Sequence, residues 1–208
     1  NRIYVANGGG NTVSVIDGAT NTVTSTISVG SYPYWAGVNS STNRIYVTNS
    51  QSNTVSVIDG TTNTVTATIS VGNYPWGVGV NSSTNRIYVA NTNSNTVSVI
   101  DGATNTVLST VSVGSSPFGL GVNSSTSRIY VANATSNTVS VIDYTPSLPP
   151  TVTTGSATNV TSNSATLNGT VNANGASTTA WFNYGTTSSS YTGTSTTQSV
   201  SGSSDTTV

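Results

Sequence analysis

One sequence of 42 residues is repeated almost four times along this chain of 208 residues. Asn-Arg-Ile-Tyr-Val begins at Asn1, Asn43 and Asn85, and Ser127 begins a fourth, slightly altered copy. A period of about 40 residues is typical of architectures in which each unit covers the hydrophobic face of its neighbour. Residues that recur in every copy are therefore expected to build the unit rather than to catalyse a reaction.

A complete copy contains four segments with the composition of β-strands. In the second copy, β-branched runs at 44–49 and 54–59 flank a short polar segment, which is the pattern of a hairpin. A third run at 64–71 alternates aliphatic residues with Thr and Ser, so one face is expected to be buried. The fourth run, 77–80, is rich in glycine, which predicts an inner strand pressed against neighbouring backbone.

The hairpin of the second copy has a self-consistent predicted register. We expect Val47 to lie opposite Val55 and Ile45 opposite Val57, which places these aliphatic side chains on one face. Tyr46 then falls on the other face. An all-β fold follows, and four antiparallel strands per unit, repeated around an axis, form the blades of a β-propeller. Fourteen strands, or about three and a half blades, are expected.

A family resemblance supports this fold. Tyr46-Val47-Thr48-Asn49 spells YVTN, and the segments around it resemble the repeats of YVTN-family β-propeller proteins over residues 1–143. The resemblance implies a propeller, usually with about seven blades, on an exported cell-surface or S-layer protein. We assign residues 1–145 to this domain.

A second, smaller domain is expected after the repeats. Residues 146–150 form a proline-rich linker, because proline restricts its own backbone and that of the preceding residue. Strands are predicted at 151–154, 164–171 and 178–185. The sequences Pro-Pro-Thr-Val at 149–152 and Ser-Ala-Thr-Leu-Asn-Gly-Thr-Val-Asn at 164–172 resemble bacterial fibronectin type III-like modules over residues 150–208. The resemblance implies that residues 151–208 form part of a β-sandwich.

Both domains are expected to be interrupted. The first repeat lacks its inner strand, the last lacks its outer one, and the sandwich still needs about three strands. We expect the chain to be part of a longer modular protein. The alternatives are two chains that complete one ring and units that stack in an assembly with shared blades.

The composition excludes several functions. Only 4% of the residues are charged, the net charge is −1, and Lys, His, Cys and Met are absent. Nucleic-acid binding is not expected without a basic surface, and neither are membrane insertion, a cofactor or a metal site. The Ser/Thr-rich, oxidation-resistant composition favours an extracellular, cell-surface location.

An aromatic residue follows a proline at the same position in three repeats. These residues are Tyr34, Trp76 and Phe118, with Trp35 and Tyr74 beside them. In a propeller they would form an arc near the inner strands. We expect the rings to pack between blades. The alternative is an exposed cluster, which would favour stacking on sugar rings, with a hydrogen bond donated to the sugar by the tryptophan indole.

Charged residues and glycosylation triplets also follow the repeat. Each arginine is expected to pair with an aspartate or lie near an aspartate-capped turn in a structural role, and the calcium-like loop 17–21 is interpreted as a turn. The repeat pairs are Arg2 and Asp17, Arg44 and Asp59, Arg86 and Asp101, and Arg128 and Asp143. Candidate Asn-x-Ser/Thr glycosylation sites, the first three expected in loops, are Asn39, Asn81, Asn123, Asn133, Asn159 and Asn168.

These features predict a non-catalytic extracellular protein of structural or adhesive function. It would belong to a cell envelope, S-layer or surface filament and act through self-association or contacts with other surface proteins. The alternative is a glycan-binding adhesin module that uses the aromatic arc. A propeller enzyme is disfavoured because no acid/base pair stands outside the repeat, so its active site would lie outside this segment.

Overall fold

The computed structural model describes residues 1–143, 150–174, 177–185 and 191–208. The chain divides into two compact units, 1–144 and 145–208, which are treated separately below. Among the described residues, no helix has the length and apolarity needed to cross a membrane. Most of the predicted linker, 146–149, lies outside the described residues.

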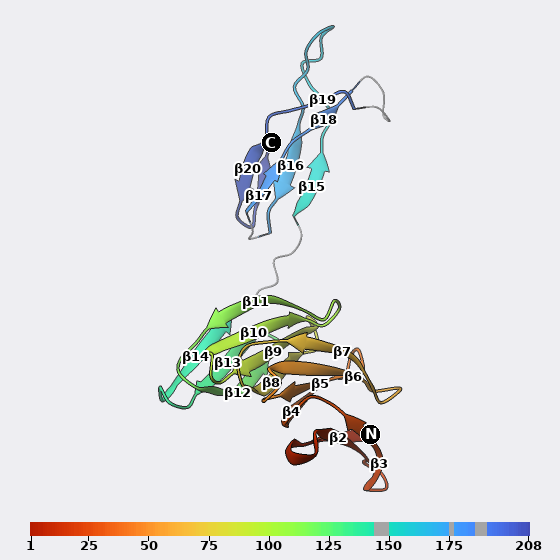
Figure 1. Cartoon of the computed structure of the whole chain (residues 1–208). Helices are drawn as coiled ribbons and strands as arrows, with labels where there is room; N and C mark the ends of the chain where they lie inside the picture. Colours follow the sequence, from red (N-terminus) through yellow and green to blue (C-terminus); the bar gives the residue numbers. More distant parts are fainter. Residues whose placement is uncertain (144–149, 175–176, 186–190) are drawn as a thin grey trace. The chain divides into compact units, whose positions relative to one another are not determined.

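Residues 1–143 fold into fourteen strands that form four antiparallel sheets (Figure 1). The first sheet contains β1 (Arg2–Asn7), β2 (Thr12–Asp17) and β3 (Thr22–Ser28), and the second contains β4 (Pro33–Asn39), β5 (Arg44–Asn49), β6 (Thr54–Asp59) and β7 (Thr64–Ser70). The third contains β8 (Pro75–Asn81), β9 (Arg86–Asn91), β10 (Thr96–Asp101) and β11 (Thr106–Ser112), and the fourth contains β12 (Pro117–Asn123), β13 (Arg128–Asn133) and β14 (Thr138–Asp143). The prediction of an all-β fold with repeated four-stranded sheets is confirmed.

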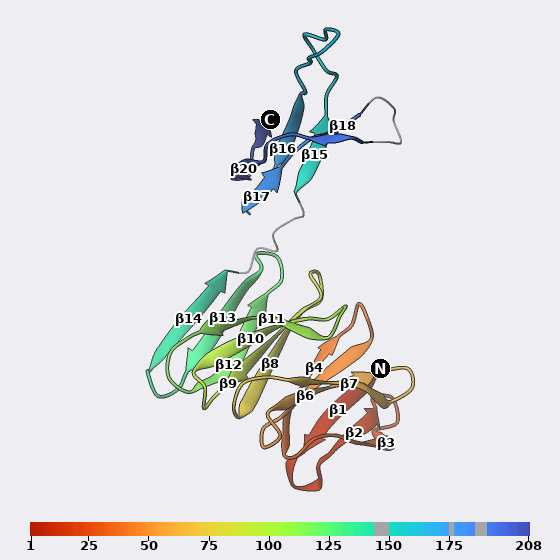
Figure 2. The same cartoon turned by 45° about the horizontal axis from the view of Figure 1, so that its top comes forward.

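The sheets follow one another in chain order, from the red first sheet to the green fourth sheet in Figure 2. Strands β4, β8 and β12 lie against one another, whereas β3, β7 and β11 hardly touch, so the sheets spread outward like propeller blades. A Cβ atom on Gly77 would overlap the Phe118 carbonyl, and one on Gly79 would lie 2.8 Å from Val122 Cγ2. Glycine therefore permits the close approach of the inner strands.

The predicted register of the hairpin is wrong by one residue. Val47 lies opposite Ser56, and Tyr46 lies opposite Val57. The connection is a four-residue loop that ends on Asn53 in the left-handed conformation (φ 56°), so the strands pair one residue later than expected. Because side chains alternate between faces, this shift places Ile45 on the opposite face from Val57.

The corrected register explains how the sheets pack, since both faces of a central sheet carry apolar side chains. On the face toward the third sheet, Tyr46, Val55 and Val57 join a buried cluster with Ile87 and Val89 of that sheet. All five side chains are 0% exposed. Ile45, Val47 and Ile58 on the other face join a second buried cluster with Val13 and Val15 of the first sheet, so both faces of the sheet are contacts between neighbouring blades.

Asparagine is abundant because the turns require left-handed backbone. Asn is the non-glycine residue that adopts this conformation most readily. Fifteen described non-glycine residues have positive φ, and eleven of them are Asn. In the turn after β6 the left-handed residue is Asn63 rather than Gly60, which donates its N–H to the Asn43 carbonyl at 2.9 Å.

The second unit contains short strands in three small sheets. Strands β15 (Thr151–Thr154), β16 (Gly169–Asn172) and β21 (Asp205–Thr207) form the first; β17 (Ser177–Ala180) pairs with β20 (Gln198–Ser201), and β18 (Asn183–Tyr184) with β19 (Gly193–Thr194). The strand predicted at 178–185 is interrupted at Trp181 and Phe182, where the pairing partner changes from β20 to β19. The strand predicted at 164–171 is reduced to β16 and an isolated Thr158–Thr166 bridge.

Candidate functional site: an aromatic row on the inner strands

The aromatic residues that follow proline lie in a β-bulge at the start of each inner strand. Pro33 lies opposite Asn49, but the next register pair is Ala36 with Val47. Tyr34 and Trp35 together therefore occupy the position opposite one residue. The same shift occurs in β8 and β12. A bulge redirects side chains out of the regular alternation of a strand, and bulges are frequent beside binding sites.

The bulges bring three rings from separate repeats into one row. The ring centroids of Tyr34 and Trp76 are 3.8 Å apart, and those of Trp76 and Phe118 are 4.5 Å apart. Tyr74 adds a fourth ring, 5.6 Å from Trp76. We call Tyr34, Tyr74, Trp76 and Phe118 the aromatic row. The sequence predicted an arc at these positions, and the structure brings it together across three sheets.

The row is clustered and open to solvent at its ends. Tyr34 is 39% exposed and Phe118 is 40% exposed, while Trp76 between them is partly buried. The indole Nε1 of Trp76 is buried without an acceptor among the described residues. Trp35 is 47% exposed, but the ring contacts of the row do not include it. The row therefore offers ring faces rather than an indole hydrogen bond.

The tyrosines that precede the prolines have strained backbone. Tyr32 and Tyr74 have φ values of 56° and 55°, a region that bulky residues rarely occupy. The N–H of Tyr74 donates to Asn53 Oδ1 at 2.9 Å, and its carbonyl accepts from Thr92 N–H at 3.0 Å. These bonds hold the turn that delivers Trp76. Such strain tends to occur at functional sites.

Thr48, the third residue of the YVTN motif, ties two inner strands together. Its hydroxyl Oγ1 accepts from the Trp35 N–H at 3.1 Å and donates to the Trp76 carbonyl at 2.7 Å. Thr48 is fully buried, and the equivalent positions in the other repeats are Ala. Sequence reasoning missed this contact, although the single Thr among three alanines was a visible signal.

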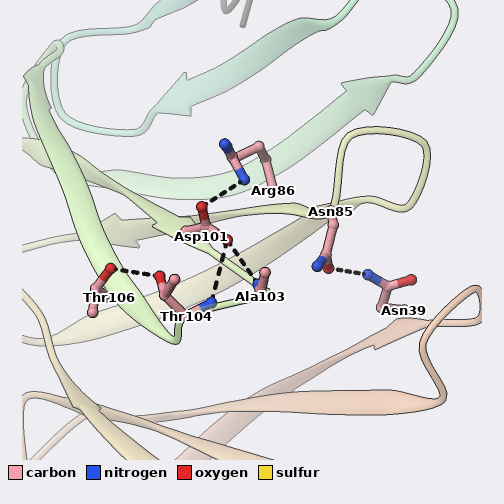
Figure 3. Close-up of polar contacts among 7 residues, drawn as sticks. All are labelled: Asn39, Asn85, Arg86, Asp101, Ala103, Thr104 and Thr106. Atoms are coloured by element: carbon pink, nitrogen blue, oxygen red, sulfur yellow. Dashed lines mark hydrogen bonds and ion pairs between the residues drawn. The ribbon is translucent and has the colours of Figure 1, made fainter. Parts of the chain in front are cut away.

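The repeated charges lie at the other end of the strands. Arg44 lies opposite Asn39 at the end of β4, six residues from Pro33, which is about 20 Å at the rise of an extended strand. Arg86 forms an ion pair with Asp101 at 3.1 Å (Figure 3). Along the strand direction, the aromatic row and the charged residues therefore occupy opposite ends of the sheet.

The four arginines make different contacts. Each lies directly opposite its aspartate, whereas the predicted register of Ile45 with Val57 would have placed Arg44 opposite Ile58. Arg128 pairs with Asp143 at 2.7 Å, which raises the pKa of the arginine. Arg2 instead donates to the Gly60 carbonyl, and Arg44 donates to Thr66 Oγ1 at 3.1 Å.

Three of the aspartates hold turns. Oδ1 of Asp17 accepts from the backbone N–H groups of Thr20 at 2.9 Å and Ala19 at 2.8 Å, which holds the pKa of this carboxyl below its usual value. Asp59 accepts from the N–H groups of the two residues that follow Gly60, with the same effect on its pKa. Figure 3 shows this turn in the third sheet, where Asp101 accepts from Ala103 and Thr104. Within the described residues, no cluster of His, Cys, Asp or Glu is placed to hold a metal ion.

Two of the repeated glycosylation candidates are corrected by the structure. Asn39 and Asn81 are 0% exposed and are the last residues of β4 and β8, not loop residues. Asn39 Nδ2, at the end of β4 in the second sheet, donates at 2.8 Å to Oδ1 of Asn85, which directly precedes β9 of the third sheet (Figure 3). A glycan on a buried amide nitrogen has no space in the folded protein.

The remaining candidates differ in exposure. Asn133 is 2% exposed, and its Nδ2 donates to Thr138 and Ser140, so glycosylation there is also sterically blocked. Asn123 is the last residue of β12 rather than a loop residue, but it is exposed, as is Asn159. Asn168 is partly buried, and its amide donates to the Ser156 carbonyl. Exposed amides therefore remain at only two of the six predicted sites.

Comparisons with known proteins support a repeat protein of the propeller type. A family model described as the NHL repeat matches residues 73–100. No curated protein matches the sequence. The structure resembles hydrazine synthase of Kuenenia stuttgartiensis, with a TM-score of 0.58 and 20% identity over 83% of this chain and 59% of that one.

Two further solved structures show the same fold. The WD40 β-propeller domain of Doa1 has a TM-score of 0.58 at 14% identity, over 68% of this chain and 46% of that one. A functionally unknown protein of Desulfotomaculum acetoxidans has a TM-score of 0.53 at 19% identity, over 63% and 47%. This chain spans less than two thirds of each neighbour. Together with the NHL match, the likeness defines the first unit as a β-propeller repeat protein.

Proposed function

We propose that this chain is a non-catalytic, extracellular adhesive scaffold whose aromatic row binds neutral glycans. The observation that carries the proposal is the clustering of Tyr34, Trp76 and Phe118 with 39–40% exposure at both ends of the row. Exposed aromatic rings in a row present apolar faces on which sugar rings can stack.

The surroundings of the row favour an uncharged ligand. The chain has only four cationic and five acidic residues, and Arg44 lies at the far end of the strand that carries Tyr34. An anionic ligand would find no counter-charge along this edge of the sheets. Sugars, which combine apolar ring faces with hydroxyl groups, suit ring faces surrounded by Ser, Thr and Asn.

The chemistry of the side chains also supports a non-catalytic role. The chain has no His, Cys, Lys or Glu, and Asp17, Asp59 and Asp101 already accept hydrogen bonds from their turns. A general acid/base pair would have to come from other groups. The neighbours include an enzyme, hydrazine synthase, but a shared fold at this identity does not transfer an activity.

We also propose a specific family for each of the two units. We place the first unit with the YVTN-type repeats of exported surface proteins, and the second with fibronectin type III-like modules. An S-layer, a cell envelope or a surface filament would present many copies of the row, and many weak contacts would then add to a firm attachment.

A glycan array tests the proposal. The wild-type chain should bind one or more neutral oligosaccharides, and Trp76→Ala should abolish that binding. Trp181→Ala is the matched control, because Trp181 is 51% exposed in the second unit, outside the row. Equal binding by the wild type and the Trp76→Ala variant, or no binding to any neutral glycan, would contradict the proposal.

A further inference from the structure

The copies of the repeat differ from one another mainly at the end of the sheets that carries the aromatic row. The two complete copies, 43–84 and 85–126, differ at 11 positions. Seven of these lie in or beside the loop after β5 and the segment that begins β8. In the second copy the seven are Thr48, Ser50, Gln51, Asn73, Tyr74, Trp76 and Val78.

The loop at the opposite end of the same strands does not change. Asn-Ser-Ser-Thr at 39–42 recurs as the same four residues at 81–84 and 123–126. Ser40 and Ser41 are exposed, as Gln51 is, so exposure alone does not account for the differences at the other end. The sheets fold in the same way in each copy, and a requirement outside the fold, such as contact with a ligand, accounts for residues that differ at one end only.

The variable loops are held against the segments that carry the aromatic rings. The backbone N–H of Gln51 donates to the Ser31 carbonyl at 3.3 Å, and that of Asn93 donates to the Asn73 carbonyl at 3.2 Å. Ser31 and Asn73 each lie three residues before a ring of the aromatic row, Tyr34 or Trp76. Each loop is therefore fixed beside the row.

Further bonds restrain the same loops. Ser50 N–H donates to the Tyr32 carbonyl at 3.0 Å, and Thr92 Oγ1 donates to the Pro117 carbonyl at 2.8 Å. The second bond joins the loop of the third sheet to the inner strand of the fourth. Side chains on a restrained backbone lose less freedom when they bind a ligand.

Three exposed primary amides project from these restrained segments. They belong to Gln51, Asn73 and Asn93, and we call them the amide rim. A primary amide has two N–H donors and a carbonyl acceptor, so one side chain can bond to neighbouring hydroxyl groups of a sugar. The equivalent positions in other copies hold shorter side chains, such as Thr135 and Ser115.

We infer that the amide rim hydrogen-bonds to the hydroxyl groups of the bound glycan and so determines which sugar is selected. The inference rests on the proposed glycan binding by the aromatic row. Stacking uses the apolar face of a sugar and discriminates poorly between sugars that differ in one hydroxyl group. A site built to hydrogen-bond a hydroxyl group, in contrast, rejects a ligand that leaves its polar groups unpaired.

Isothermal titration calorimetry with four neutral hexasaccharides tests this division of roles. The probes are cellohexaose, maltohexaose, chitohexaose and the mannohexaose that differs from cellohexaose only in the orientation of one hydroxyl group on each sugar. For the wild-type chain, the Kd values of the tightest and weakest probes should differ at least about tenfold. Gln51→Ala/Asn73→Ala/Asn93→Ala should reduce this ratio below about threefold, because only stacking remains.

The control is Ser40→Ala/Thr61→Ala, which changes two exposed residues at the opposite end of the sheets and should leave the ratio within about twofold of the wild type. Circular dichroism confirms that each variant folds. If the triple variant binds none of the probes, its three single variants are compared in the same way.

The outcomes separate this inference from the proposed function. No binding of any probe by the wild-type chain, or equal binding by Trp76→Ala, overturns both. Binding that Trp76→Ala abolishes, with the same ratio of Kd values in the amide-rim variants as in the wild type, overturns the role of the amide rim alone.

Discussion

The two units of this chain share a composition rich in Ser, Thr, Asn and Gly, yet they bury very different cores. Among the described residues, the first unit contains 21 of the buried apolar residues and the second contains three: Val171, Ala173 and Val200. The first unit repeats one amphipathic sheet, so every face that a sheet offers fits the next sheet. The second has short strands in separate small sheets, and Val152 and Val160 remain 69% and 68% exposed. Periodicity, rather than hydrophobic content, lets a polar chain build a core.

The largest expected effect comes from the centre of the repeated core. Ile87→Ala should lower the free energy of unfolding of the first unit by about 2–5 kcal/mol, since Ile87 is 0% exposed and a cavity would remain. The control is Val160→Ala in the second unit, with an expected change within about 0.5 kcal/mol. Urea denaturation measures both. Similar losses would contradict the contrast between the two units.

Thr48 provides a test of the coupling between inner strands. Thr48→Val keeps the side-chain volume but removes the hydroxyl that bonds to Trp35 and Trp76, and should cost about 1–2 kcal/mol. Thr48→Ser retains the hydroxyl and should recover part of the loss. Thermal unfolding compares the variants. If Thr48→Val were as stable as the wild type, these bonds would not contribute to stability.

A natural difference between repeats offers a smaller, stabilising change. Asn39 Nδ2 donates to Asn85, but the equivalent Asn81 Nδ2 is buried without a hydrogen-bond partner in the described part of the chain, because the fourth repeat has Ser127 where the third has Asn85. Ser127→Asn should supply the acceptor and also suits the left-handed backbone there (φ 53°). We expect stabilisation of about 0.5–1.5 kcal/mol.

The reciprocal substitution is the control for this prediction. Asn85→Ser should leave Asn39 Nδ2 without its acceptor and should destabilise the first unit by a similar amount. Chemical denaturation of both variants gives the comparison. Destabilisation by Ser127→Asn would show that the two sheet contacts are not equivalent, despite the repeat.

The smallest effect is the dependence of stability on pH. The backbone N–H groups of the turns lower the pKa of Asp17 and Asp59 below 3.8. Since the folded-state pKa is below the unfolded one, the ionised carboxyls stabilise the fold above about pH 4. This contribution is lost as the pH falls through the lowered pKa values. Asp59→Asn should flatten the stability curve below pH 4, as measured by denaturation at several pH values.

The sequence predicted the architecture better than the packing. The positions of the strands in the first unit follow from the alternation of Val and Ile with Thr and Ser. The register of the hairpin formed by β5 and β6 did not follow from this alternation, because the left-handed Asn53 lengthens the turn by one residue. Tyr46 was therefore placed on the wrong face, and only the structure shows that both faces are covered.

The sequence predicted which residues form the aromatic row, but it did not predict the burial or the contacts of the site residues. The proline–aromatic pattern located Tyr34, Trp76 and Phe118, but the bulges that join their rings depend on pairing between distant strands. Asn39 and Asn81 matched a glycosylation triplet, which contains no information on burial. In the second unit, the change of pairing partner at Trp181 ended a strand that alternation alone would have continued.

Nuclear magnetic resonance of the indole N–H groups tests the central claim most directly. The chain has three tryptophans, so Trp35, Trp76 and Trp181 give three resolvable signals after assignment by substitution. Cellohexaose, maltohexaose and chitohexaose are suitable neutral probes. The account predicts that at least one of them shifts the signal of Trp76 in a saturable manner and leaves that of Trp181 unchanged. Saturable shifts confined to Trp181, or no shift with any probe, would contradict a glycan site on the aromatic row.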